Sequence, residues 1–184
     1  MSKARAFTTA AAASVLSAAV ALQTASAEEG TVEAFSSWKA QGQIFPTGVD
    51  EATFVGVLSG VIYVKEDDQG LDASTMDAGL ISCPGRVTIN TSDGSQVGDG
   101  KCVMVTAEGD RVYASFKCEG AYLEGCNGEF TLAGGTGEMA EVSGGGPIQF
   151  KSSFTSLSSG SPGTIVEQGA IGLAVWPKLT YSLP

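Results

Sequence analysis

The segment 116–150, FKCEGAYLEGCNGEFTLAGGTGEMAEVSGGGPIQF, constrains the fold more than any other part of the chain. It holds two cysteines, nine glycines and short alternations of apolar and polar residues. Alternation with a period of two is typical of half-buried strands, and glycine clusters between such runs mark tight turns. The segment therefore predicts a tightly turned antiparallel sheet that is clamped by disulfides.

The first 27 residues have the pattern of a secretory signal. Lys3 and Arg5 give a positive start, an Ala-rich apolar run follows at 10–22, and Ala25-Ser26-Ala27 fits the small-residue cleavage pattern. The apolar run falls short of the roughly 20 strongly apolar residues that a spanning helix needs. We therefore expect residues 1–27 to be removed, leaving a periplasmic or secreted protein with no stable membrane span.

The remaining chain is strongly acidic. Residues 28–184 carry 20 acidic and 8 basic side chains, so their formal charge is −12. Nucleic acids and anionic membrane surfaces attract Lys and Arg instead. The charge therefore argues against a nucleic-acid partner and is consistent with a soluble exported protein.

Four cysteines, Cys83, Cys102, Cys118 and Cys126, follow the signal. An even number in an exported chain favours disulfides. Counting alone does not separate the three pairings, but strand geometry favours Cys83–Cys102 and Cys118–Cys126, because each pair brackets a turn-rich segment. Zinc is disfavoured, since the chain has no CxxC motif and no histidine. We expect no metal and no cofactor.

The sequence predicts about eight short strands separated by turns. The clearest run is 54–65, which is apolar on both faces and therefore indicates a strand covered on both sides. Residues 92–100 (SDGSQVGDG) are expected to form a cluster of turns, and residues 107–110 are expected to close a hairpin between 101–106 and 111–117. Residues 28–43 fit either an amphipathic helical turn or a first strand. We accordingly expect an N-terminal segment at 28–50 and a β-barrel domain at 51–184.

Eight antiparallel strands in one domain favour closure into a barrel, because an open sheet of this size leaves two edge strands whose unpaired backbone groups can bind other chains. A β-sandwich is the main alternative. The many glycines within the strands favour the barrel, since they allow sharp coiling and close approach of strands.

A series of short motifs occurs in one order along the chain: Cys83-Pro84-Gly85, Gly100-Lys101-Cys102, Gly109-Asp110, Cys118-Glu119-Gly120, Gly125-Cys126-Asn127-Gly128, 130–137 (FTLAGGTG) and Gly144-Gly145-Gly146. With these motifs the chain resembles small exported bacterial proteins related to the allene oxide cyclase and dirigent type of eight-stranded barrel. The resemblance covers about 52–181. Met139 and Glu141 depart from its pattern, since an aromatic residue and a glycine commonly follow the turn.

The resemblance implies an all-β fold, a single antiparallel eight-stranded barrel of the calycin or allene-oxide-cyclase-like type with two disulfides. It also implies an alternative function, an isomerase or cyclase that acts on a hydrophobic, lipid-like substrate in the barrel cavity. The catalytic residues of the plant cyclase do not align with this chain position by position, so none is carried over.

The chemistry of the side chains favours a protein that is not an enzyme. Without histidine, the Ser-His-Asp and Cys-His systems are excluded. Carboxylates remain, and Glu119, Glu124 and Glu129 surround the second disulfide, but surface charge explains them more simply. Two groups offer oxygen ligands for calcium without the spacing of an EF-hand loop: Glu66, Asp67, Asp68 and Asp72, and then Asn90, Asp93 and Asp99.

Small eight-stranded barrels are either filled by their own side chains or hold one small ligand. The aromatic residues expected to line or rim such a pocket are Phe54, Tyr63, Tyr113, Phe116, Phe130, Phe150 and Trp176, together with Trp38, Tyr122 and Tyr181. The leading hypothesis is a non-enzymatic exported barrel that acts as a binding or structural module. Its candidate partners are a small apolar ligand, a protein and a second copy of the chain.

Overall fold

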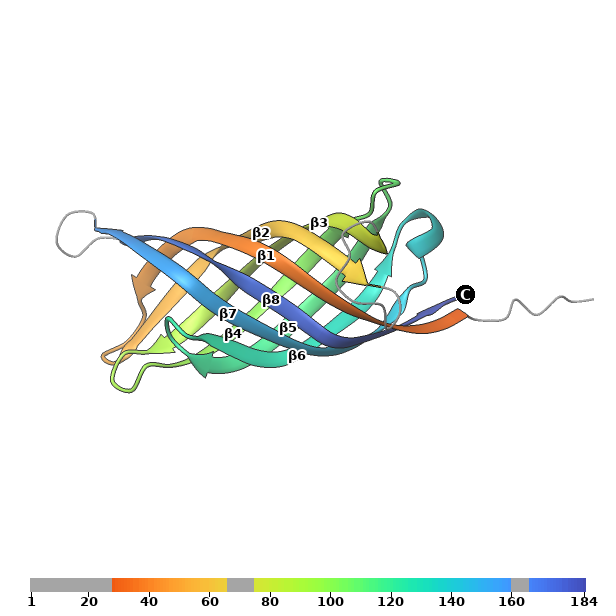
Figure 1. The fold of residues 1–184 in the computed structure, drawn as a ribbon. Coiled ribbons are helices and arrows are strands. Elements are labelled where there is room, and N and C mark those ends of the chain that lie inside the picture. Colours follow the sequence, from red (N-terminus) through yellow and green to blue (C-terminus); the bar gives the residue numbers. More distant parts are fainter. Residues whose placement is uncertain (1–27, 66–74, 160–165) are drawn as a thin grey trace, which may run out of the picture.

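Eight antiparallel strands close into one barrel, in which each strand pairs with its neighbours in sequence and β1 pairs with β8 (Figure 1). The computed structural model describes residues 28–65, 75–159 and 166–184, without the side chains of 153–159 and 166–168. The strands are β1 (Glu28–Pro46), β2 (Glu51–Lys65), β3 (Met76–Asn90), β4 (Ser95–Val105), β5 (Arg111–Ala121), β6 (Gly125–Gly135), β7 (Ser143–Ser159) and β8 (Val166–Leu183). The predicted all-β fold and closed barrel are therefore confirmed, and the sandwich alternative is wrong.

The barrel differs from the sequence-based expectation in where it begins and in the length of its strands. The segment 28–50 does not precede the barrel, because Glu28–Pro46 forms β1 and pairs with both β2 and β8. Strands of 11 to 19 residues run through glycines for which the sequence predicts turns. The expected signal at 1–27 and the acidic group at 66–72 lie outside the described residues.

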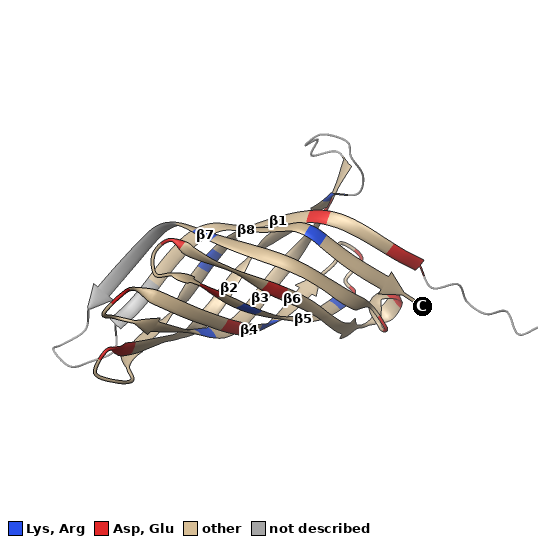
Figure 2. Ribbon diagram, turned by 90° about the horizontal axis from the view of Figure 1, so that it is seen from below, with Lys and Arg blue, Asp and Glu red and all other residues tan. Residues whose placement is uncertain are grey.

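Side chains alternate between the inside and the outside of the barrel. On β1, Val32, Ala34, Trp38 and Ala40 are buried together with Ser36, while the residues between them face outward. A strand places successive side chains on opposite faces, so one parity of each strand builds the core. Acidic residues recur in the turns at both ends of the barrel (Figure 2).

Both predicted disulfides are confirmed. Cys83–Cys102 joins β3 to β4 and Cys118–Cys126 joins β5 to β6, with Cα–Cα distances of 4.1 and 5.5 Å. All four cysteines belong to the inward-facing parity, so the disulfides lie inside the barrel. Two disulfides are typical of proteins from an oxidising environment.

The expected hairpins are also present. Thr106 and Gly109 close the β4–β5 turn through backbone hydrogen bonds, Thr106 N to Asp110 O at 2.9 Å and Gly109 N to Thr106 O at 3.1 Å. The Gly-Gly-Thr-Gly turn leaves β6 and enters a single 3₁₀ turn at Gly137–Met139 before β7. The Asp110 carboxylate accepts a hydrogen bond from the Glu138 backbone N–H at 3.1 Å and joins these two turns.

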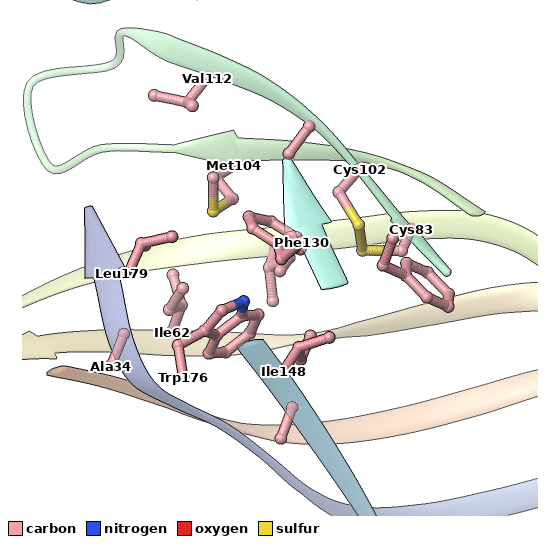
Figure 3. Close-up of a cluster of buried hydrophobic side chains, with 14 of the residues drawn as sticks. Ala34, Ile62, Cys83, Cys102, Met104, Val112, Phe130, Ile148, Trp176 and Leu179 are labelled. Atoms are coloured by element: carbon pink, nitrogen blue, oxygen red, sulfur yellow. A yellow bond between two sulfur atoms is a disulfide. The ribbon is translucent and has the colours of Figure 1, made fainter. Parts of the chain in front are cut away.

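The half of the barrel next to these turns is filled with side chains. Trp176, Phe130 and Ile148 are each 1% exposed, and the rings of Phe130 and Trp176 meet edge to face with centroids 5.3 Å apart (Figure 3). Ile62, Met104 and Leu179 surround them. In the described residues, no helix is long and apolar enough to cross a membrane.

Candidate functional site

The other half of the barrel contains an apolar cavity. It has a volume of about 120 Å³ and lies at the end that carries the turns 47–50, 91–94 and 122–124. Phe54, Phe116 and Phe150 line it, with Trp38 and Leu58 beside them. Phe116 and Phe150 have ring centroids 5.2 Å apart, and Trp38 meets Phe150 edge-on at 6.5 Å.

The aromatic rings of the cavity rest on glycines. A Cβ atom at Gly42 or Gly56 would overlap the ring of Phe54, and one at Gly100 would overlap the ring of Phe116. Glycine within a strand commonly marks a place where another group approaches the backbone closely. The glycines therefore allow the rings of Phe54 and Phe116 to lie directly against the backbone of the barrel wall.

The β5–β6 turn forms part of the rim of the cavity. Tyr122 and Leu123 both line the cavity, and Leu123 is 53% exposed with a backbone φ of +67°. A positive φ is strained for a large side chain and is kept only where the surroundings impose it. The Leu123 side chain is thus held at the mouth of the cavity.

Hydrogen bonds hold this turn from both sides. The Tyr122 N–H donates to Gly94 O at 2.8 Å in the neighbouring turn, and the Ser152 N–H of β7 donates to Glu124 O at 3.1 Å. The Gln96 side-chain amide donates to Gly125 O at 3.0 Å. Because these bonds are made within the protein itself, the rim is formed before any ligand arrives.

Four polar side chains accompany the apolar lining, and they come from Arg86, Gln96, Tyr122 and Ser152. Arg86 belongs to the outward parity of β3, where its Nε donates to Asp99 Oδ1 at 2.9 Å. That hydrogen bond and the charge of Asp99 raise the pKa of Arg86. Gln96 and Ser152 lie on the inward parity of β4 and β7, so a ligand in the cavity would meet their hydrogen-bonding groups.

The structure brings together only part of the predicted pocket. Phe54, Phe116 and Phe150 line the cavity, whereas Phe130 and Trp176 belong to the filled half. Tyr63 and Tyr113 lie on the outer surface, because their neighbours Ile62, Val112 and Ala114 take the inward positions. Tyr63 stacks there on Phe35, with centroids 5.2 Å apart.

The carboxylates considered as acids or bases lie away from the cavity. Glu119 and Glu129 face outward from β5 and β6, and Glu124 is exposed in the turn. None of the three is among the lining residues.

The residues of the second candidate calcium group have other partners. Asn90 Oδ1 accepts from the Ser92 N–H at 2.9 Å, and Asp99 pairs with Arg86. The Ser95 N–H donates to Asp93 Oδ1 at 2.8 Å and lowers the pKa of that carboxyl. Within the described ranges, no cluster of three metal-ligating side chains occurs.

Leu58 and Leu123 are cavity residues that were not predicted, whereas Trp38 and Tyr122 were among the aromatic residues expected at a pocket. The alternation of buried and exposed residues along β1 places Trp38 inside the barrel. Leu123 carries no such signal, because Tyr122-Leu123-Glu124 contains none of the residues that favour a positive φ.

No protein-family model matches the chain, and no curated protein matches it either. Among solved structures, it is similar to a pterocarpan synthase dirigent protein, with 12% sequence identity and a TM-score of 0.31. That alignment covers 86% of this chain and 99% of the other.

Proposed function

We propose that the protein is a non-enzymatic, exported barrel that binds one small apolar ligand in the open half of its interior. The observation that carries the proposal is the cavity between Phe54, Phe116 and Phe150, in a barrel whose other half is filled. An apolar cavity with a few polar groups is the usual form of a small-molecule site.

The size of the cavity limits the ligand. Drug-sized ligands occupy pockets of roughly 300–1,000 Å³, whereas an engineered apolar cavity of about 150 Å³ binds benzene. At about 120 Å³, this cavity suits a single ring or a short alkyl group. Gln96 and Ser152 would meet a polar substituent on such a ligand.

The rim favours binding because it is already ordered. The Cys118–Cys126 disulfide and the hydrogen bonds of Tyr122 and Ser152 hold the β5–β6 turn in place. A preformed site avoids the entropy cost of ordering a loop when the ligand binds. The disulfides also fit a periplasmic or secreted location.

An isomerase or cyclase is the alternative function, and it would need an acid or base in the cavity. The lining residues of the described part include the phenol of Tyr122 and the guanidinium of Arg86, but no carboxylate. The geometry therefore favours binding over turnover.

A pair of substitutions on β2 tests the proposal. Leu58→Phe adds volume to the cavity lining, so we expect it to weaken binding of p-cresol about tenfold or more. Val57→Phe adds a larger side chain one residue away on the outer face, where Val57 is 42% exposed, so it should leave binding unchanged. The measurement is titration of the ¹⁵N-labelled protein with p-cresol by two-dimensional NMR.

The proposal also predicts which signals move. In the unsubstituted protein, the side-chain amide of Gln96 and the backbone amides of Leu123 and Ser152 should shift as p-cresol is added. Equal affinities for the two variants, or shifts confined to the outer surface, would show that the cavity is not the binding site.

A further inference from the structure

The exterior of the barrel has two different faces. On β8, β1, β2 and β3 an apolar face is formed by six outward-facing residues: Phe35, Val61, Tyr63, Leu80, Leu173 and Val175. On β5 and β6 the outward positions hold polar residues, such as Lys117, Asn127, Glu129 and Thr131. Contiguous exposed apolar surface on one side of a protein commonly marks an interaction site.

The strand register makes the apolar face continuous. Phe35 lies opposite Tyr63, and Val61 lies opposite Leu80 on β3. Ser37 lies between Val61 and Leu173, and it is the small residue at the centre of the face. Leu80 is 61% exposed and Leu173 is 42% exposed, so the face is open to solvent.

Opposite charges flank this face along β1. Glu33 lies three residues before position 36 and Lys39 lies three residues after it, both on the outward parity. Glu33 pairs with Lys65 at 3.5 Å and keeps 67% of its side chain exposed. Lys39 lies opposite Ser59 and Ile171, and it has no carboxylate within 4 Å among the described residues.

We infer that two copies of the chain pair through the apolar face, about a two-fold axis that lies in the interface and crosses β1 at right angles near Ser36. This arrangement runs the two β1 strands antiparallel across the interface. Glu33 of each copy then faces Lys39 of the other copy. Phe35 faces Ser37, and Tyr63 faces Val61, so large side chains meet smaller ones.

The charges select a second copy as the occupant. In the antiparallel arrangement the face is complementary to itself, and this is the property that a two-fold interface requires. An axis parallel to the strands would instead oppose Glu33 to Glu33 and Lys39 to Lys39. Sheets that pack face to face keep their strands within about 30° of alignment, which is compatible with contact between the two central strands.

Charge reversal at one position tests the arrangement directly. In the homodimer of the Lys39→Glu variant, the introduced carboxylate faces Glu33 of the other copy at both contacts. In the homodimer of the Glu33→Lys variant, the introduced ammonium group faces Lys39 of the other copy at both contacts. We expect each variant alone to dimerise about tenfold more weakly than the natural protein, as measured by sedimentation velocity at near-physiological salt.

Mixing the two variants gives the decisive result. In the antiparallel mixed dimer, one contact joins the two introduced groups and the other joins the two natural ones, and both are pairs of opposite charge. An equimolar mixture should therefore form dimers at concentrations at which each variant alone is monomeric. If the strands ran parallel, the natural dimer would already join like charges at both contacts, so neither variant alone would dimerise more weakly than the natural protein.

Two further variants serve as controls. Leu80→Lys should weaken dimerisation without restoration in any mixture, whereas Thr131→Lys on the polar face should have no effect. Circular dichroism checks that each variant is folded.

A natural protein that stays monomeric at concentrations of about 100 µM would overturn the proposal. So would a dimer that neither Lys39→Glu nor Leu80→Lys weakens. A dimer that is weakened by Leu80→Lys but shows no recovery in the mixture would overturn the antiparallel arrangement.

Discussion

The position of the Trp38 ring depends on Gly172, which lies opposite Trp38 on the neighbouring strand β8. A Cβ atom at Gly172 would overlap both the indole of Trp38 and the carbonyl oxygen of Lys151. The same relation holds for Phe54 and Phe116 and the glycines beneath them. Glycine residues at these positions therefore decide where the rings lie, and thus the shape of the cavity.

Gly172→Ala should lower the free energy of unfolding by about 1–3 kcal/mol, because the added methyl group overpacks the wall. It should also change the near-ultraviolet circular dichroism of the indoles. Gly94→Ala is the matched control: its backbone φ is +76° but no atom lies within 4 Å of the added Cβ. The control should be destabilised by about 1 kcal/mol through its backbone alone and keep the indole signal. An unchanged indole signal and stability in Gly172→Ala would contradict this account.

The choice of pocket residues shows what can be predicted at the scale of single residues. Some of the expected aromatic side chains lie inside the barrel and others outside, because Phe54 and Tyr63 differ in parity on β2, as do Tyr113 and Phe116 on β5. The two members of such a pair face opposite sides of the sheet unless a β-bulge lies between them. Because β2 is apolar on both faces, its composition alone does not reveal which parity is buried.

At the scale of the elements, the Cys118–Cys126 disulfide and the β5–β6 hairpin form one unit. The bridge closes the hairpin whose turn carries Tyr122 and Leu123 at the rim. The sequence separations of the two bridges are 8 and 19 residues. The chain-entropy model assigns them about 2.5 and about 3 kcal/mol of stabilisation, respectively.

Replacing both Cys118 and Cys126 by alanine should lower the free energy of unfolding by about 2.5 kcal/mol in urea titrations. It should also speed hydrogen exchange at the Tyr122 and Ser152 amides, since both are bonded around the hairpin turn. The Cys83→Ala/Cys102→Ala variant is the control, with a loss of about 3 kcal/mol and no selective effect on those two amides. Equal exchange rates at these two amides in both variants would contradict the claim that the Cys118–Cys126 disulfide holds the rim.

Strand existence is more predictable than strand extent. Turn dipeptides and the alternation of apolar and polar residues predict the turns at 107–110 and 134–137. They also predict both disulfides, because each cysteine pair brackets a turn-rich segment. They do not reveal that β4 continues through Gly98 and Gly100, because glycine in this barrel makes room for rings as well as for turns. Leu123 cannot be predicted as a rim residue for a different reason. Its positive φ belongs to a turn that is held by hydrogen bonds to other parts of the folded chain.

The whole molecule is a barrel with one filled and one open half. Trp176, Phe130 and Ile148 fill the half next to the Gly-Thr-Gly turn, and the three phenylalanines surround the space in the other half. A filled half stabilises the closed barrel, because burial of apolar side chains is the main favourable contribution to folding. The open half can therefore keep a cavity that the fold does not need.

The most direct measurement of the central claim is a crystal structure of the protein soaked with p-cresol. We predict density for one ring between Phe54, Phe116 and Phe150, with its hydroxyl directed toward Gln96 or Ser152. A cavity that is closed by its own side chains, or a ring bound only on the outer surface, would contradict the proposed function.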